Sequence, residues 1–122
     1  MNIAILHYSV PPIVGGVESV IAHHARLMSA NGHSVRLIAA RGEALNEWIP
    51  LTAIPLADSR HTRVAQMKEQ LDRGEVTKDF ESLRDELAEQ LQGALSGADI
   101  LIAHNVCSLN KNLALTAALH QL

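Results

Sequence analysis

A pair of glycines, Gly15 and Gly16, immediately precedes the first stretch whose apolar residues have helical spacing. Because glycine has no side chain, the backbone N–H groups here can approach an anion closely, and the positive end of the helix dipole adds attraction. These features favour a phosphate site, with a diphosphate as its natural occupant. The alternative interpretation is that the glycines only allow the chain to turn, since an isolated Gly-Gly is a weak motif.

The glycine pair does not fit the pattern of a dinucleotide-binding site. In that pattern Gly-x-Gly-x-x-Gly directly follows the first strand, and an acidic residue ends the second strand. Here Gly15 comes eight residues after His7, no third glycine completes the motif, and the second apolar run leads into Arg41 and Gly42. The sequence therefore does not predict an NAD site, and Arg41 is interpreted as a solvated loop cation rather than a contact for a 2′-phosphate.

The remaining histidines and the single cysteine indicate no second kind of chemistry. His23 and His24 are adjacent, whereas two metal ligands on one helix face are three or four positions apart. Cys107 has no evident base partner and is expected to pack as a small apolar residue. We therefore expect no metal site and no cofactor.

A parallel α/β sheet is the element that must position the glycines. Short apolar runs at 3–7, 35–40, 51–56 and 99–103 are typical of strands buried on both faces. Helical spacing follows at 17–30, along 60–96 with a break at 73–75, and at 109–122. This alternation predicts one domain over 1–122, an open Rossmann-like sheet in the order 3-2-1-4 with helices on both faces. The segments 8–17 and 104–109 should then face one crevice at the carboxyl ends of the first and fourth strands.

Two helices carry specific expectations about packing. The first should bury a stripe made of Val17, Val20, Ile21, Leu27 and Met28, with His24 on the same face. The last stops without a capping glycine or a following strand, so we expect a sheet that is incomplete at the C-terminus. Residues 109–122 should then be poorly ordered or packed against another copy, as in a crystal dimer formed through the uncovered edge.

The composition is that of an ordinary globular domain and argues against polyanionic partners. Of the 122 residues, 48% are hydrophobic and 19% charged, and the net charge of -3 gives no electrostatic case for binding nucleic acid. An aromatic content of 2% leaves no stacking platform for single strands. No apolar run approaches a membrane span, and no signal peptide is evident. We expect a cytoplasmic protein without a transmembrane segment, and peripheral membrane contact of the full protein stays open.

Two segments resemble the amino-terminal domain of the family 4 retaining glycosyltransferases, which have the GT-B fold. The first is Pro11-Pro12-x-x-Gly15-Gly16-Val17-Glu18, followed by a helix and by Gly32-His33-x-Val35. The second is Ala98-Asp99-Ile100-Leu101-Ile102-Ala103-His104-Asn105. The resemblance covers residues 1–42 and 97–122, and the middle of the chain matches only in element type.

The resemblance implies that the chain is the partial, acceptor-side domain of a two-domain enzyme. Such enzymes move a sugar from a nucleoside-diphosphate sugar to an acceptor with retention. Gly15 and Gly16 would bind the donor diphosphate, His104 would be the catalytic residue, and Glu18 and Asn105 would bind the acceptor. The partners would be the donor, the acceptor and a carboxy-terminal domain that these residues do not include, so the chain alone should be inactive.

Two alternatives stay open beside this interpretation. The chain could be a non-catalytic Rossmann-like nucleotide-binding or regulatory module. Glu18 could be an ordinary acid in the first helical turn, favourable to the helix dipole.

Overall fold

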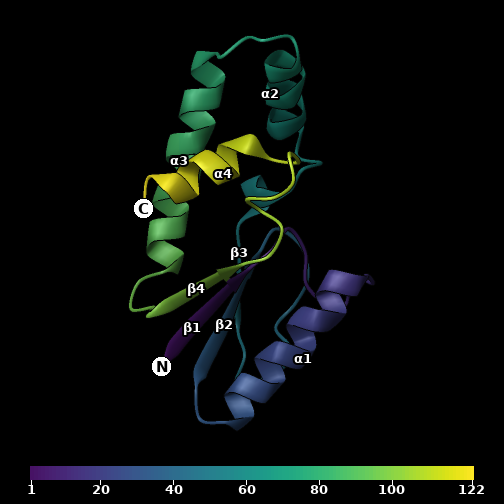
Figure 1. Ribbon diagram of the computed structural model, residues 1–122, viewed down its shortest axis with the longest axis vertical. Helices are drawn as coiled ribbons and strands as arrows, with labels where there is room; N and C mark the ends of the chain where they lie inside the picture. The colour runs from purple at the N-terminus through teal and green to yellow at the C-terminus, as the bar shows by residue number, and fades with distance from the viewer.

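A four-stranded, all-parallel sheet in the order β3-β2-β1-β4 forms the centre of the computed structural model, which describes residues 1–122 (Figure 1). Its strands are β1 (Asn2–Leu6), β2 (Ser34–Ala39), β3 (Leu51–Ala53) and β4 (Ile100–Ala103). Ile3 of β1 pairs with Val35 on one side and with Ile100 on the other. The predicted fold class is confirmed, including the strand order and the parallel pairing of the first and fourth strands.

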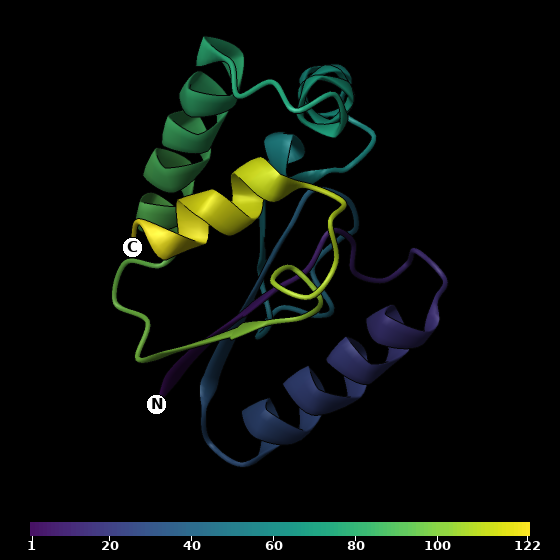
Figure 2. The same cartoon turned by 45° about the horizontal axis from the view of Figure 1, so that its top comes forward.

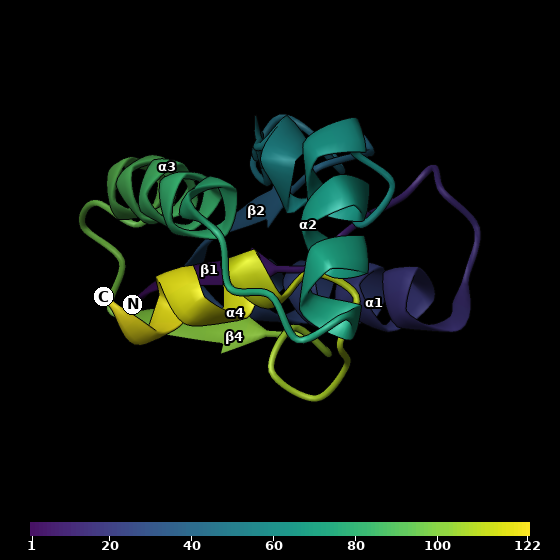
Figure 3. The ribbon, with the colours of Figure 1, turned by 90° about the horizontal axis from the view of Figure 1, so that it is seen from above.

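Helices cover both faces of this sheet (Figure 2). They are α1 (Gly16–Ala30), α2 (Thr62–Asp72), α3 (Lys78–Ala94) and α4 (Leu113–His120), with a short 3-10 turn, η1 (Pro55–Ala57), after β3. α1 packs against one face, while α2, α3 and α4 lie over the other, as the view from above also shows (Figure 3). This division follows from right-handed crossovers, because the chain reverses its direction across the sheet between β3 and β4.

The core is divided by the alternation of side chains along the strands. Ile3 and Ile5 of β1 pack with Ile21 of α1 in a cluster of nine buried residues. Ala4 and Leu6 point to the other face and join a cluster of 16 that includes the buried leucines of α3 and α4. Both faces of β1 are therefore covered, which explains why this strand is apolar at consecutive positions.

Glycines and a proline set several of the element boundaries. Gly74 has φ +81°, a left-handed conformation that ends α2, so the region 60–96 forms two helices rather than one kinked helix. β3 ends at Ala53, earlier than the expected 51–56, because Pro55 begins η1 and cannot donate to a ladder.

The buried face of α1 matches only part of the predicted stripe: Ile21 is buried and Val17 and Met28 pack against the core. Its buried residues are Ile21, Ala22 and Ala25, whereas Val20 and Leu27 are 42% and 63% exposed and His24 is exposed as well. Positions 20, 24 and 27 form the neighbouring helical stripe, rotated toward solvent. The prediction was wrong at these three positions because it followed the larger apolar side chains, whereas the small residues Ala22 and Ala25 are the ones buried beside Ile21.

The carboxy-terminal helix packs within the chain. α4 begins at Leu113, later than the expected 109, and its Ala114, Leu115 and Ala118 are buried against the α3 side of the core. Asn112 caps it: its Oδ1 accepts from the Leu115 N–H at 3.1 Å, and its Nδ2 donates to the Leu56 carbonyl at 2.9 Å. Contact of 109–122 with another copy stays a prediction.

The β4 edge of the sheet carries no further strand. An apolar groove of about 410 Å³ runs along it, lined by residues that include Leu101, Cys107 and Leu119. This is the edge that the sequence analysis expected to be uncovered. No helix of the chain is both long and apolar enough to cross a membrane.

Candidate functional site

The Glu18 carboxylate, in the first turn of α1, lies against two side chains from the segment that follows β1. Ser9 Oγ donates to Glu18 Oε1 at 2.7 Å, and His7 Nε2 lies 3.5 Å from the same oxygen. Burial raises the pKa of this carboxyl, but hydrogen bonds from Ser9 and the backbone together with the nearby His7 outweigh it and hold the pKa below its ordinary value. Glu18 is therefore ionised at neutral pH, with a fixed direction.

Pairing beyond the strand ends explains the position of Ser9. The β1 and β2 chains continue side by side past their strands, through an isolated parallel bridge between Ser9 and Arg41 and a hydrogen bond from the Val10 N–H to the Arg41 carbonyl. The carboxyl ends of both strands therefore deliver polar side chains to one place, as expected for an open parallel sheet.

A second contact joins the segments after β1 and β4. His7 Nδ1 lies 3.0 Å from the His104 carbonyl oxygen, and because a carbonyl only accepts, this nitrogen carries the hydrogen. The His104 N–H in turn donates to the Leu6 carbonyl at 2.9 Å. Burial lowers the pKa of His104, with further lowering by His7 and His24, so its ring is neutral at pH 7. His104 Nε2 is buried without a hydrogen-bond partner.

The N-terminus of α1 is open. Gly15, its N-cap, provides no side-chain cap, and the N–H groups of Gly16 and Val17 donate to no atom of the chain. A Cβ at residue 15 would displace the Glu18 carboxylate from its position, whereas a Cβ at Gly16 meets no heavy atom within 4 Å. Free N–H groups beside open space are what an anion site at a helix start requires.

A polar cleft opens at this end of the sheet, next to the start of α1. Its volume is about 420 Å³, and its charged and hydrogen-bonding residues include His7, Ser9, Glu18, Arg41, Arg60 and Lys111. They come from the segments after β1, β2, β3 and β4 and from α1, so five parts of the sequence converge on it. Arg41 is paired with Asp58, with Nε 3.1 Å from Oδ2, whereas Arg60 and Lys111 form no ion pair.

The residues selected from the sequence separate into two groups. Gly15, Gly16 and Glu18 lie together at the start of α1, and Glu18 lines the cleft. His104 and Asn105 lie after β4 and do not line it, although His104 is linked to it through His7. Asn105 has φ 62°, and its carbonyl accepts from the Ser108 and Leu109 N–H groups, so it forms a tight turn.

Sequence reasoning missed His7, Tyr8 and Ser9 as parts of the site and left Arg60 and Lys111 out. The signal for the first three was their place directly after a buried strand at the switch point, within or beside the segment 8–17. Arg41, interpreted as a solvated loop cation, lines the cleft and is paired.

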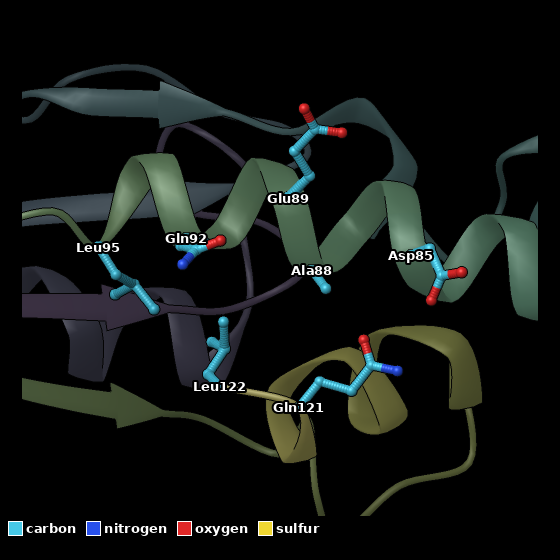
Figure 4. Close-up of a pocket in the computed structure, with 7 residues that line it drawn as sticks. All are labelled: Asp85, Ala88, Glu89, Gln92, Leu95, Gln121 and Leu122. Carbon is cyan, nitrogen blue, oxygen red and sulfur yellow. The ribbon is translucent and has the colours of Figure 1, made fainter.

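The other cavities of the chain lack this convergence. One of about 500 Å³ lies between α3 and the C-terminal residues (Figure 4). It presents the carboxylates of Asp85 and Glu89 with no cation, and it is remote from the carboxyl ends of the strands. No three His, Cys, Asp or Glu side chains are grouped closely enough to hold a metal ion.

Fold and site together define an open parallel α/β domain with a polar cleft at its topological switch point. Comparison of the chain with protein-family models, with curated proteins and with solved structures finds no match.

Proposed function

We propose that the chain is the acceptor-side domain of a retaining glycosyltransferase, which transfers a sugar from a nucleoside-diphosphate sugar to an acceptor hydroxyl. The observation that carries the proposal is the start of α1, where unpartnered N–H groups at Gly16 and Val17 lie beside an oriented carboxylate at the edge of a polar cleft. The motif resemblance to family 4 enzymes, at the same residues, supports it independently. The donor would be bound mainly by a second domain.

In this proposal the open helix start binds the donor diphosphate. When the bond between the sugar and the diphosphate breaks, negative charge grows on the leaving phosphate. Backbone N–H groups already aimed at that position stabilise the growing charge, because they need no reorganisation during the reaction. The helix dipole acts in the same direction.

Glu18 and His104 would serve the acceptor side. Ser9 fixes the direction of the Glu18 carboxylate, which can then accept hydrogen bonds from sugar hydroxyls. The neutral imidazole of His104, whose Nε2 has no partner, can donate to or accept from an acceptor or leaving-group oxygen once the second domain closes. Asn105 would contribute its side-chain amide from the same turn.

The test is the full-length coding sequence and its product. Codons after Leu122 should encode a second Rossmann-like domain with a Glu-x7-Glu pattern. The full-length protein should release a nucleoside diphosphate from one member of a nucleotide-sugar panel in an acceptor-dependent manner, and residues 1–122 alone should not. An open reading frame that ends at residue 122 would instead support a non-catalytic nucleotide-binding or regulatory module.

A further inference from the structure

Two cations in the cleft have no partner within the chain. Arg60 lies between η1 and α2, and Lys111 lies in the loop between β4 and α4. Both residues line the cleft although α2, α3 and β4 separate them in the sequence. The third cation, Arg41, is already neutralised by Asp58. The cleft therefore has positive charge left over at the Arg60 and Lys111 side, while Glu18 lies on the side of α1.

A residue that lines the same cleft has a buried hydroxyl without a partner. Tyr8 is 4% exposed and lines the cleft, and its OH makes no hydrogen bond to the chain. Lys111 Nζ is 5.7 Å from the centre of the Tyr8 ring. Burial raises the pKa of the Tyr8 phenol, with a smaller contribution from Cys107, so the hydroxyl keeps its proton and can donate. Buried polar groups are nearly always paired, and a ligand oxygen would pair this one.

The opposite side of the cleft has a different chemistry. Glu18 accepts hydrogen bonds from hydroxyl groups, whereas a phosphate inside the cleft is favoured at the Arg60 and Lys111 side, where the unpaired cations lie. The volume of about 420 Å³ is that of a small-molecule site, for which pockets of roughly 300–1,000 Å³ are typical. A fitting ligand carries a dianionic group at one end and hydroxyls at the other.

We propose that the cleft binds a phosphate monoester of a sugar or polyol, with the phosphate on Arg60, Lys111 and the Tyr8 hydroxyl and the sugar hydroxyls on Glu18. Describing this ligand as the acceptor rests on the proposed transferase function, but its binding does not. The chain would then add a sugar to an already phosphorylated acceptor.

Isothermal titration of the 122-residue chain tests binding without any donor. The probes are glucose 6-phosphate, glucose and inorganic phosphate. Glucose 6-phosphate should bind at least about tenfold more tightly than either half alone, because it uses both sides of the cleft. Equal affinity for glucose 6-phosphate and inorganic phosphate, or no binding of the ester, would overturn the proposal.

Paired variants locate the phosphate. Arg60→Gln combined with Lys111→Gln should weaken binding of glucose 6-phosphate by about tenfold or more. The matched control combines Arg26→Gln with Lys78→Gln, two exposed cations outside the cleft that also form no ion pair. The control should leave the affinity unchanged, and an equal loss in both pairs would reduce the effect to net charge and refute the site.

Tyr8→Phe provides a second, smaller test. It removes the unpartnered hydroxyl and keeps the ring that packs in the core, so the chain should fold with an unchanged or higher melting temperature while binding weakens several-fold. Unchanged binding would exclude the hydroxyl as a phosphate contact. If the chain does not bind glucose 6-phosphate but the full-length protein still transfers a sugar, this inference alone is refuted. If the chain binds glucose 6-phosphate but the full-length protein transfers no sugar from any nucleotide sugar, only the proposed function is refuted.

Discussion

The open space at Gly16 provides a sharp test of the proposed transferase function. A Cβ added there meets no heavy atom of the chain within 4 Å, and the residue is not in the left-handed region. Gly16→Val should therefore fold normally, with a stability change within about 1 kcal/mol, in the favourable direction that the better helix propensity of valine implies. The same side chain occupies the space through which a phosphate would reach the N–H groups.

The expected loss of activity follows from hydrogen-bond geometry. A phosphate held about 2.9 Å from the Gly16 and Val17 nitrogens and pushed outward by an ångström is beyond hydrogen-bond distance. Removal of one such donor typically costs about 10²- to 10³-fold in turnover, and displacement of the whole phosphate removes both donors. The transfer rate of the full-length protein should therefore fall by at least about 10²-fold.

The assay is the initial rate of transfer with the cognate donor, measured beside a thermal melt. Gly93→Val is the matched control, because Gly93 is also an exposed helical glycine whose added Cβ meets nothing within 4 Å, and it lies in α3 outside the cleft. A folded Gly16→Val protein that keeps more than about a tenth of wild-type turnover, a barrier change below about 1.4 kcal/mol, would show that the glycines only form a turn.

Three further predictions concern stability and are measured by urea unfolding. A carboxyl with a depressed pKa adds stability that is full above its unfolded pKa and is lost as pH falls through its folded pKa. Glu18→Gln should therefore cost roughly 1 kcal/mol at pH 7 and progressively less below the ordinary value of 4.5. Leu87→Ala, in the core, should cost about 2–5 kcal/mol, whereas Leu27→Ala on the exposed side of α1 should cost less than about 0.5 kcal/mol. Asn112→Ala should cost about 1–3 kcal/mol, because it removes the α4 cap and leaves the Leu56 carbonyl unpaired.

Each of these predictions has an outcome that contradicts it. A Glu18→Gln deficit that grows on acidification would mean that the native carboxyl does not have a depressed pKa. An equal loss of stability from Leu87→Ala and Leu27→Ala would contradict the observation that Leu87 in α3 is buried while Leu27 in α1 is exposed. A stable Asn112→Ala protein would show that water or another donor satisfies the Leu56 carbonyl.

The fold was predictable because β1, β2 and β4 each contain consecutive apolar residues, a pattern typical of parallel strands covered on both faces, although β4 itself is only partly buried. The third strand has a weaker apolar pattern. The run 51–56 does not show that the strand ends at Ala53, before Pro55 begins η1. The α1 stripe was misjudged because hydrophobic size, rather than close packing through alanine, guided the choice of face. Local spacing alone does not distinguish these two causes.

The candidate site was only partly accessible from the sequence. Gly15, Gly16 and Glu18 are neighbours along the chain, so a short motif was enough to group them. The contact of Ser9 with Glu18 depends on the path of the loop between β1 and α1, which spacing does not specify. Arg60 and Lys111 are separated by two helices and a strand, and only the reversal of the sheet at β1 and β4 brings them into one cleft.

The central place of β1 has a consequence for how the chain folds during synthesis. Of the four strands, β1 is the first to be synthesised, and it can pair with β2 as soon as α1 and β2 have been made. Its other edge must wait for β4: the Asn2 N–H donates to the Asp99 carboxylate across 97 residues of sequence. Until then one edge of this otherwise buried strand stays unpaired. Such long-range parallel pairing slows folding and prolongs the time for which an unpaired, aggregation-prone strand edge is exposed. We therefore expect β1 to be the strand of this chain that most needs protection by a chaperone.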